Sequence, residues 1–213
     1  MATTKIDVSF TGGNPATAGA EPEAGRNALL AAHTAGLNLH AISRHSGGAT
    51  RINVGTLVAG TGRNVIPAWA EMKMETRGET TELNEYMFKN ACRILEAAAA
   101  MHDVQVKIKI AGSAPGMIPS EGLVKKLAEI ASAIPDFTEV MEYGRSGGSE
   151  DYTYFVQRVQ QLGGEATYAL LGTELAAGHH HYYFDINEDV IPLGVRFFSE
   201  AARNITNTLS PLK

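Results

Sequence analysis

The first half of the chain alternates between two hydrophobic periods. Strands are predicted where apolar residues recur every second position, and helices where they recur every three to four. The strand segments are Lys5–Thr11, Arg51–Ala59, Val65–Thr76 and Val104–Ile110; the helical ones are Asn27–Leu39 and Thr80–Met101. The resulting order is βαββαβ over residues 5–111, which is typical of a ferredoxin-like domain with one antiparallel sheet and two helices on one face.

The second half has a different organisation. Residues 112–119 contain two prolines and two glycines, a composition typical of a linker. Helices and short strands then alternate, which indicates a mostly parallel α/β layer over residues 120–213. Helices are expected at Glu121–Ala133, Glu150–Gln160 and Glu188–Asn207, and strands at Glu139–Glu142 and Ala166–Gly172. Two strands bury too little surface alone, so this half is expected to be part of a larger α/β domain.

Composition and charge narrow the possible partners. The 213 residues carry a formal net charge of -5, with 44% hydrophobic and 19% charged residues, as in packed globular proteins. The longest basic run is the pair Lys125–Lys126, so nucleic acid is not an expected partner. No apolar run reaches the roughly 18 to 20 residues of a membrane span. With a single cysteine, Cys92, and no signal-like start, we expect a cytoplasmic protein that does not bind membranes.

Three segments contain side chains suited to chemistry, and each also has a purely structural explanation. Three consecutive histidines at His179, His180 and His181 could supply a metal ligand, or could lie in a polar surface loop. The segment Gly148, Ser149, Glu150 follows a glycine-rich turn. Its serine could cap a helix, or its exposed amides could bind a carboxylate.

The third segment contains Asn64 and, thirteen residues later, Arg77. An arginine near an asparagine amide can bind a substrate carboxylate through two hydrogen bonds. The alternative is a solvated charge at the end of a strand.

Taken in order, five stretches resemble one family. They are AGAEPEAGRNALLAA, RINVGTLVAGTGRNVIP, METRGE, GSEDYTYF and GTELAAGHHHYYFDINEDVIPLG, and together they cover essentially the whole chain. The family comprises metal-dependent amidohydrolases and carboxypeptidases, including glutamate carboxypeptidase, aminoacylases and aminobenzoyl-glutamate hydrolase, with the greatest likeness to the last. The resemblance implies a ferredoxin-like lid or dimerisation domain, followed by the C-terminal part of a catalytic α/β domain that binds two zinc or manganese ions.

The resemblance also implies roles for individual residues. His180 corresponds to the family's C-terminal metal ligand. Asn64 and Arg77 correspond to lid residues that hold the transition-state oxygen and the substrate carboxylate, and Gly148, Ser149 and Glu150 to an active-site wall. The implied substrate is an N-acyl amino acid such as aminobenzoyl-glutamate. In such enzymes the metals polarise the amide carbonyl and activate water.

Two departures from the family pattern stand out. The H-x-D motif, the paired glutamates and the general-base glutamate, which precede the lid in the family, do not occur in these 213 residues. Thr17 stands where the family has a histidine that reaches the active site of the partner protomer, and threonine cannot carry a positive charge at neutral pH.

Three hypotheses follow. The first is a C-terminal portion of a hydrolase that is inactive without a chain supplying the N-terminal catalytic half. The second is a non-catalytic dimerisation module that forms a homodimer through the lid. The third is an intact enzyme with a metal site rebuilt from the histidine run, Asp185 and Glu188.

Overall fold

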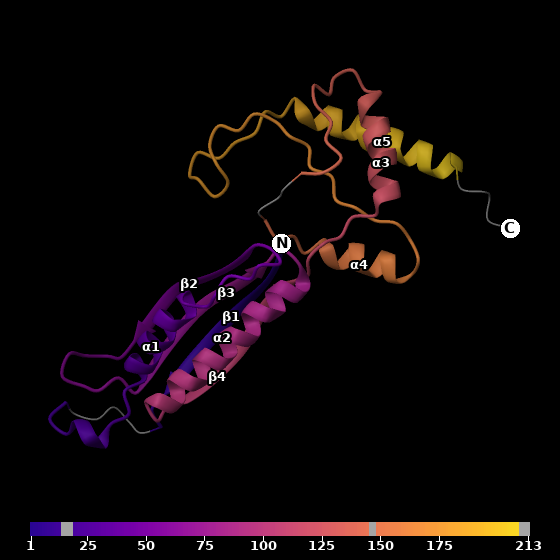
Figure 1. Cartoon of the computed structure of the whole chain (residues 1–213). Coiled ribbons are helices and arrows are strands. Elements are labelled where there is room, and N and C mark those ends of the chain that lie inside the picture. The colour runs from indigo at the N-terminus through magenta and orange to yellow at the C-terminus, as the bar shows by residue number, and fades with distance from the viewer. Residues whose placement is uncertain (14–18, 145–147, 209–213) are drawn as a thin grey trace. The chain divides into compact units, whose positions relative to one another are not determined.

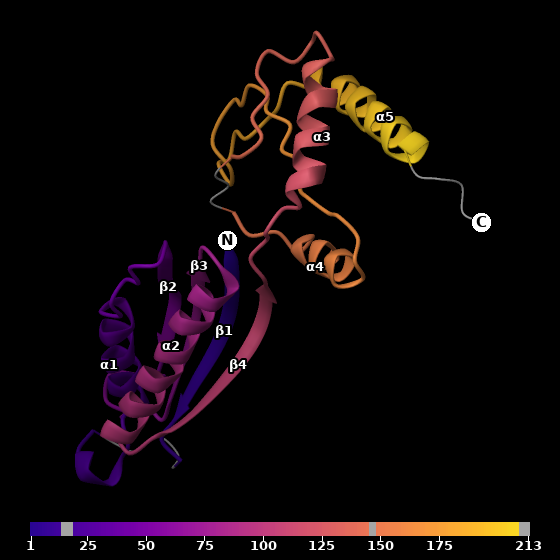
Figure 2. The same cartoon turned by 45° about the vertical axis from the view of Figure 1, so that its right-hand side comes forward.

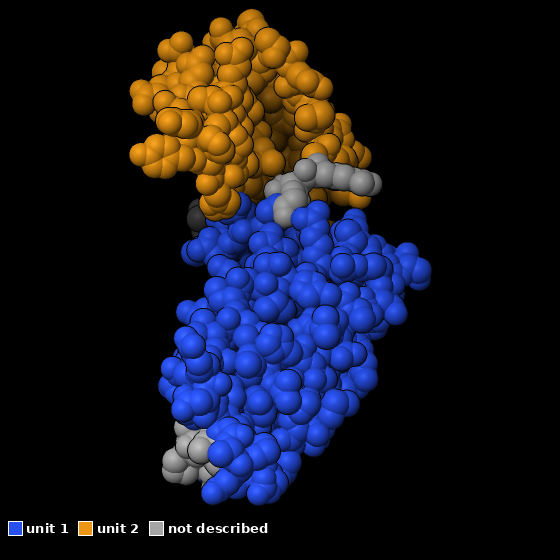
Figure 3. Space-filling view, turned by 90° about the vertical axis from the view of Figure 1, so that its left-hand side faces the viewer, with its two compact units in different colours: residues 1–117, 146–155 blue, residues 118–145, 156–213 orange. Residues whose placement is uncertain are grey.

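A computed structural model describes residues 1–13, 19–144 and 148–208. It divides into two compact units, the first formed by residues 1–117 with 146–155 and the second by residues 118–145 with 156–213. Figure 3 colours the two units separately. We call them the lid unit and the C-terminal unit.

The lid unit contains one antiparallel sheet with two long helices on one face (Figures 1 and 2). The strand order is β2-β3-β1-β4, so that β2 and β4 form the edges. The elements in chain order are β1 (Ala2–Thr11), a 3-10 turn η1 (Pro22–Ala24), α1 (Ala28–His40), β2 (Thr50–Ala59), β3 (Trp69–Gly78), α2 (Thr81–Met101) and β4 (Gln105–Ala114). The expected βαββαβ order is confirmed.

The core of the lid unit lies between the sheet and the two helices. Alternate residues of the central strands are fully buried there, including Ile6, Val8 and Phe10 of β1. From the helices, alanines of α1 and the larger side chains Met87 and Leu95 of α2 fill the remaining space. The opposite face of the sheet is polar, as the period of two predicts.

A buried hydrogen-bond network joins the sheet to α2. The Thr76 hydroxyl donates to the Asn84 side-chain oxygen at 2.9 Å, and the Asn84 amide donates to the Thr4 hydroxyl at 2.9 Å. All three residues are buried, so each bond replaces one to water that folding removed. Beside this network, Gly78 lets the end of β3 approach the first turn of α2. A Cβ there would lie 2.2 Å from the Asn84 backbone nitrogen.

Several boundaries in the lid unit differ from the expected ones, most of all at the start of β3 and the end of β4. The strand expected from Val65 begins only at Trp69, because residues 65–68 form the loop between β2 and β3 and include Pro67, which has no N–H to donate. Strand β4 extends to Ala114, three residues into the segment expected to be the linker, and pairs with the start of β1.

The C-terminal unit contains α3 (Glu121–Ser132), most of α4 (Thr153–Gln161) and α5 (Val190–Thr208). The first three residues of α4 belong to the lid unit. A small core joins α3 to α5 around Ala131, Ile134 and Phe197. The strand predictions for Glu139–Glu142 and Ala166–Gly172 are wrong, since neither segment pairs with another strand among the described residues. A strand requires a hydrogen-bonded neighbour, and here the apolar side chains of Leu170 and Leu171 are exposed instead. None of the helices described combines the length and apolarity that a membrane span requires.

Candidate functional site

Arg77 lies near the end of β3, on the polar face of the lid sheet, and forms a two-point ion pair. Its Nε and Nη2 atoms donate to the two carboxylate oxygens of Glu75 at 2.9 and 3.1 Å. Both side chains are about three-quarters buried. Glu75 therefore fixes the plane of the Arg77 guanidinium.

The segment Gly148–Glu150 lies at the same end of the sheet. The α-amino group of Met1, just before β1, donates to the Gly148 carbonyl oxygen at 2.9 Å. Burial lowers the pKa of this amino group, and the nearby charges of Arg77 and Arg51 lower it further, while Glu150 acts in the opposite direction. Four residues after Glu150, the Tyr154 hydroxyl contacts Ser113 at the end of β4. The structure thus brings Arg77 and the Gly148–Glu150 segment to one end of the lid, which we call the near end.

Ser149 does not cap a helix. Helix α4 begins only at Thr153, because the residues before it form tight turns in which Thr153 and Tyr154 donate backbone N–H groups three residues back. The Ser149 hydroxyl is buried and has no hydrogen-bond partner among the described residues. The capping interpretation is therefore wrong, and a buried unpaired hydroxyl is a group that a ligand could satisfy.

Asn64 lies at the opposite end of the sheet. It is exposed in the loop between β2 and β3, and its carbonyl oxygen accepts a hydrogen bond from Gly19 at 3.0 Å. Gly19 follows the loop that contains Thr17, which itself lies outside the described residues. At about 3.3 Å per residue, the part of β3 from Trp69 to Arg77 separates this far end from Arg77 by roughly 26 Å. Asn64 and Arg77 of one chain thus do not lie near each other, and their roles at a shared substrate stay a prediction.

The three histidines have different environments in the C-terminal unit. They lie in a loop closed by a bridge between Leu175 and Ile186. His179 stacks on Phe184 with ring centroids 5.3 Å apart, and the Nδ1 atom of His181 accepts from the Tyr183 backbone N–H at 3.1 Å.

His180 is exposed, and among the described residues its imidazole forms no hydrogen bond. Its backbone φ of 64° lies in the left-handed region, which is uncommon for a residue other than glycine. Of the three rings, His180 is therefore the one whose nitrogens are available to an external group.

The described residues contain no group of three or more His, Cys, Asp or Glu side chains placed to hold a metal ion. In the loop preceding α5, the Asn187 side-chain oxygen accepts a hydrogen bond from the Asp189 backbone N–H at 3.0 Å. The hypothesis of a site rebuilt from the histidine run, Asp185 and Glu188 thus receives no support from the geometry.

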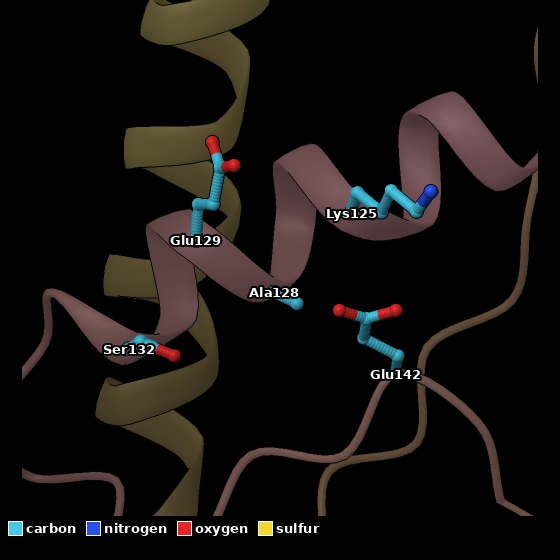
Figure 4. Close-up of a pocket in the computed structure, with 5 residues that line it drawn as sticks. All are labelled: Lys125, Ala128, Glu129, Ser132 and Glu142. Atoms are coloured by element: carbon cyan, nitrogen blue, oxygen red, sulfur yellow. The ribbon is translucent and has the colours of Figure 1, made fainter.

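The surface has two hollows among the described residues, and one of them includes a candidate site residue. One, of about 480 Å³, lies beside α3 in the C-terminal unit and is lined by Lys125, Ala128, Glu129, Ser132 and Glu142. Figure 4 shows the carboxylate of Glu142 directed toward Ala128 while Glu129 points away. It contains none of the candidate site residues. The other, of about 440 Å³, lies at the near end of the lid and is lined by Arg77 with residues that the sequence analysis did not select, notably Arg44 and Arg51.

Comparison with known proteins agrees with this architecture. Residues 9–204 match the sequence profile described as peptidase family M20/M25/M40. The chain belongs to this family. It is 47% identical to indole-3-acetyl-aspartic acid hydrolase of Enterobacter agglomerans and 46% identical to one of the subunits of p-aminobenzoyl-glutamate hydrolase from Escherichia coli K12. Each match covers 96% of this chain. The chain spans about half the length of these relatives, 47% in both cases.

Two solved structures resemble this chain. An aminobenzoyl-glutamate utilization protein from Klebsiella pneumoniae superimposes with a TM-score of 0.81 at 41% identity, over 96% of this chain and 48% of that one. A Bacillus subtilis protein described as a dinuclear metal binding peptidase from the M20 family has a TM-score of 0.70 at 20% identity, over 98% and 51% of the two chains, and shares the fold.

Proposed function

We propose that this chain is the lid and the C-terminal catalytic portion of a metal-dependent amidohydrolase. The substrate would be an N-acyl amino acid of the aminobenzoyl-glutamate type. Support comes from family membership and from two relatives whose names denote hydrolases of amino-acid conjugates. Because the chain spans about half of each relative, activity would require the remaining half from the same or another polypeptide. One relative is named as one subunit of its enzyme, consistent with assembly from more than one chain.

The observation that carries the proposal is the family match over residues 9–204. The separation of Asn64 from Arg77 bears on how the site would be assembled. The two residues belong to opposite ends of one hairpin, yet the family resemblance assigns both to one substrate. A homodimer formed through the lid resolves this conflict, because a twofold axis can bring the far end of one protomer to the near end of its partner. Each site would then combine Arg77 and the Gly148–Glu150 segment of one protomer with Asn64 and the Thr17 loop of the other.

A metal site would use His180 as one of its ligands. An imidazole nitrogen suits zinc, and the His180 ring lacks competing hydrogen bonds in the described residues. One of the structural relatives is described as binding two metals, and this chain provides one of the several ligands that such a site needs. When bound, the ions polarise the amide carbonyl and activate water. Within this chain, Arg77 would orient the substrate through its carboxylate and Ser149 would donate its unpaired hydroxyl to it.

A second candidate function, as a dimerisation module, is favoured by the edge of the lid. Strand β2 is an edge strand, and the neighbouring helix α1 exposes Leu30 and Leu37, which are spaced by seven residues and share a face. Val58 of β2 is also exposed. Such an edge is suited to pairing with a second copy.

The test is a chimera in which the first half of the Enterobacter agglomerans hydrolase precedes this chain. With zinc or manganese added, we expect it to hydrolyse p-aminobenzoyl-glutamate or indole-3-acetyl-aspartate, whereas the chain alone does not. His180→Ala should abolish hydrolysis and His179→Ala should preserve it, because His179 stacks on Phe184. Hydrolysis by the isolated chain, or a folded chimera that remains inactive with both metals, would contradict the proposal.

A further inference from the structure

The hollow at the near end of the lid is unusually rich in arginine. Arg44, Arg51 and Arg77 line it together with Ile52, Asn53 and Glu75. Three guanidinium groups thus share the lining with a single carboxylate, an excess of two positive charges among the residues that line a space of about 440 Å³. Such a hollow is suited to an anion of charge minus two.

Strand pairing fixes two of these arginines side by side. Arg51 of β2 is directly opposite Arg77 of β3 in the antiparallel register, and Asn53 is opposite Glu75. Like charges directly opposite each other destabilise a strand pair. Neither turn geometry nor packing requires an arginine at position 51, since its side chain is exposed. The pair is therefore a cost to the fold that an anionic ligand would offset.

The arginines differ in what they already bind. Glu75 holds Arg77 through both carboxylate oxygens, and Arg44 donates to the Thr50 carbonyl oxygen at 3.2 Å. Arg51 forms no salt bridge or side-chain hydrogen bond with any residue that the structure describes. The nearby acid Glu79 accepts instead from the Ala49 backbone N–H at 2.9 Å. Arg51 is thus the guanidinium with its full donor set available.

We propose that Arg51, assisted by Arg44, binds the second carboxylate of an N-acyl dicarboxylic amino acid whose first carboxylate is bound by Arg77. This inference rests on the proposed hydrolase function. It adds a second carboxylate-binding position, which would favour dicarboxylic over monocarboxylic substrates. Adjacent strands lie about 4.8 Å apart. The two carboxylates of a glutamate or aspartate residue in the substrate can span this spacing between Arg51 and Arg77. A monocarboxylic substrate would leave one of the positive charges unpaired, so charge would discriminate against it.

Binding to the full chain tests this inference without requiring hydrolysis. The probes are N-benzoyl-L-glutamate and N-benzoyl-L-glutamine, which are nearly isosteric and differ by one negative charge. Titrations are followed by the arginine Nε–H resonances in NMR spectra and by calorimetry. We expect the glutamate to bind about tenfold tighter than the glutamine and to shift the Arg51 resonance, as a charge-assisted hydrogen bond implies.

Variants test whether Arg51 is responsible for the preference for benzoyl-glutamate over benzoyl-glutamine. Arg51→Gln should reduce the preference to about twofold or less, and Arg51→Lys should retain part of it, since lysine keeps the charge but loses the two-point geometry. The matched control is Arg93→Gln on α2, where the native side chain donates to Asn90, and it should leave the preference unchanged. Equal affinity for the two probes, an unshifted Arg51 resonance, or an Arg51→Gln variant with the wild-type preference would each overturn the inference.

The chimera separates this inference from the proposed function. If it hydrolyses benzoyl-glutamine as well as benzoyl-glutamate, the hydrolase proposal stands and the role of Arg51 is refuted. If it hydrolyses neither but the full chain still discriminates between them through Arg51, the binding site stands and the hydrolase proposal fails.

Discussion

Replacing Gly78 by alanine should destabilise the lid unit strongly. A Cβ at this position would lie 2.2 Å from the Asn84 nitrogen, 2.6 Å from the Leu83 carbonyl carbon and 2.8 Å from the Asn84 Cα. All three are backbone atoms of the first turns of α2, so no side-chain rotation can relieve the contact. Overpacking of this kind costs about 1 to 3 kcal/mol or more, and we expect the upper end because the backbone itself must shift.

Gly36 in α1 provides the matched control. A Cβ there would meet only the terminal methyl of Met72, at an ordinary 3.9 Å. Gly36→Ala should therefore stabilise the unit by about 0.5 to 1 kcal/mol, because alanine loses less backbone entropy than glycine in a helix.

The assay is urea unfolding followed by tryptophan fluorescence. Trp69 is the single tryptophan of the chain and lies in β3, so the signal reports on the lid unit. A Gly78→Ala cost below about 1 kcal/mol would refute the argument that the end of β3 is held rigidly against α2. Destabilisation by Gly36→Ala would show that the alanine-rich face of α1 is packed more tightly than the structure indicates.

Three further predictions concern other parts of the chain. Asn84→Ala should cost about 2 to 4 kcal/mol in the same assay, because it leaves the buried Thr76 and Thr4 hydroxyls without their partner; Asn90→Ala, on the same helix, should cost less than about 1 kcal/mol. Burial, followed by the nearby charge of Glu96, raises the pKa of the Cys92 thiol, so alkylation by iodoacetamide at pH 8 should be slower than for a cysteine peptide and should reach the peptide rate in denaturant. An equal rate in the folded chain would contradict this. Leu37→Glu should weaken any dimer formed through the lid, measured by light scattering, while Met101→Glu, exposed at the end of α2, should not.

The order of strands and helices in the lid unit could be predicted from the sequence, because these elements bury their apolar faces against one another. The alternation in β1 and β4 and the helical spacing in α2 each identify a buried face, and all the elements that cover those faces lie within residues 2–114. The apolar Val65 and Ile66 favour a strand before Trp69, but Pro67 has no N–H to donate to a neighbouring strand, and the segment is a loop.

The C-terminal strands could not be predicted from local pattern alone. The run Ala166–Gly172 is apolar enough for a buried strand, but strand formation depends on a neighbour, and the described residues contain none beside it. The separation of Asn64 from Arg77 likewise depends on the hairpin register. Two residues that are thirteen positions apart can lie side by side across a turn or be separated by the full length of a strand. The register of β2 and β3 decides between these two arrangements. The same register would have revealed Arg51 beside Arg77.

The central claim, that each site combines residues from both protomers, is tested most directly by mixing two inactive variants of the chimera. Arg77→Gln removes the near end and Asn64→Ala the far end, and each alone should be inactive. Random reassortment of equal amounts puts half of the protomer pairs in mixed dimers, each with one intact site, so about a quarter of wild-type activity should return. No recovery, in mixtures shown by native mass spectrometry to contain mixed dimers, would mean that each site is built within one chain.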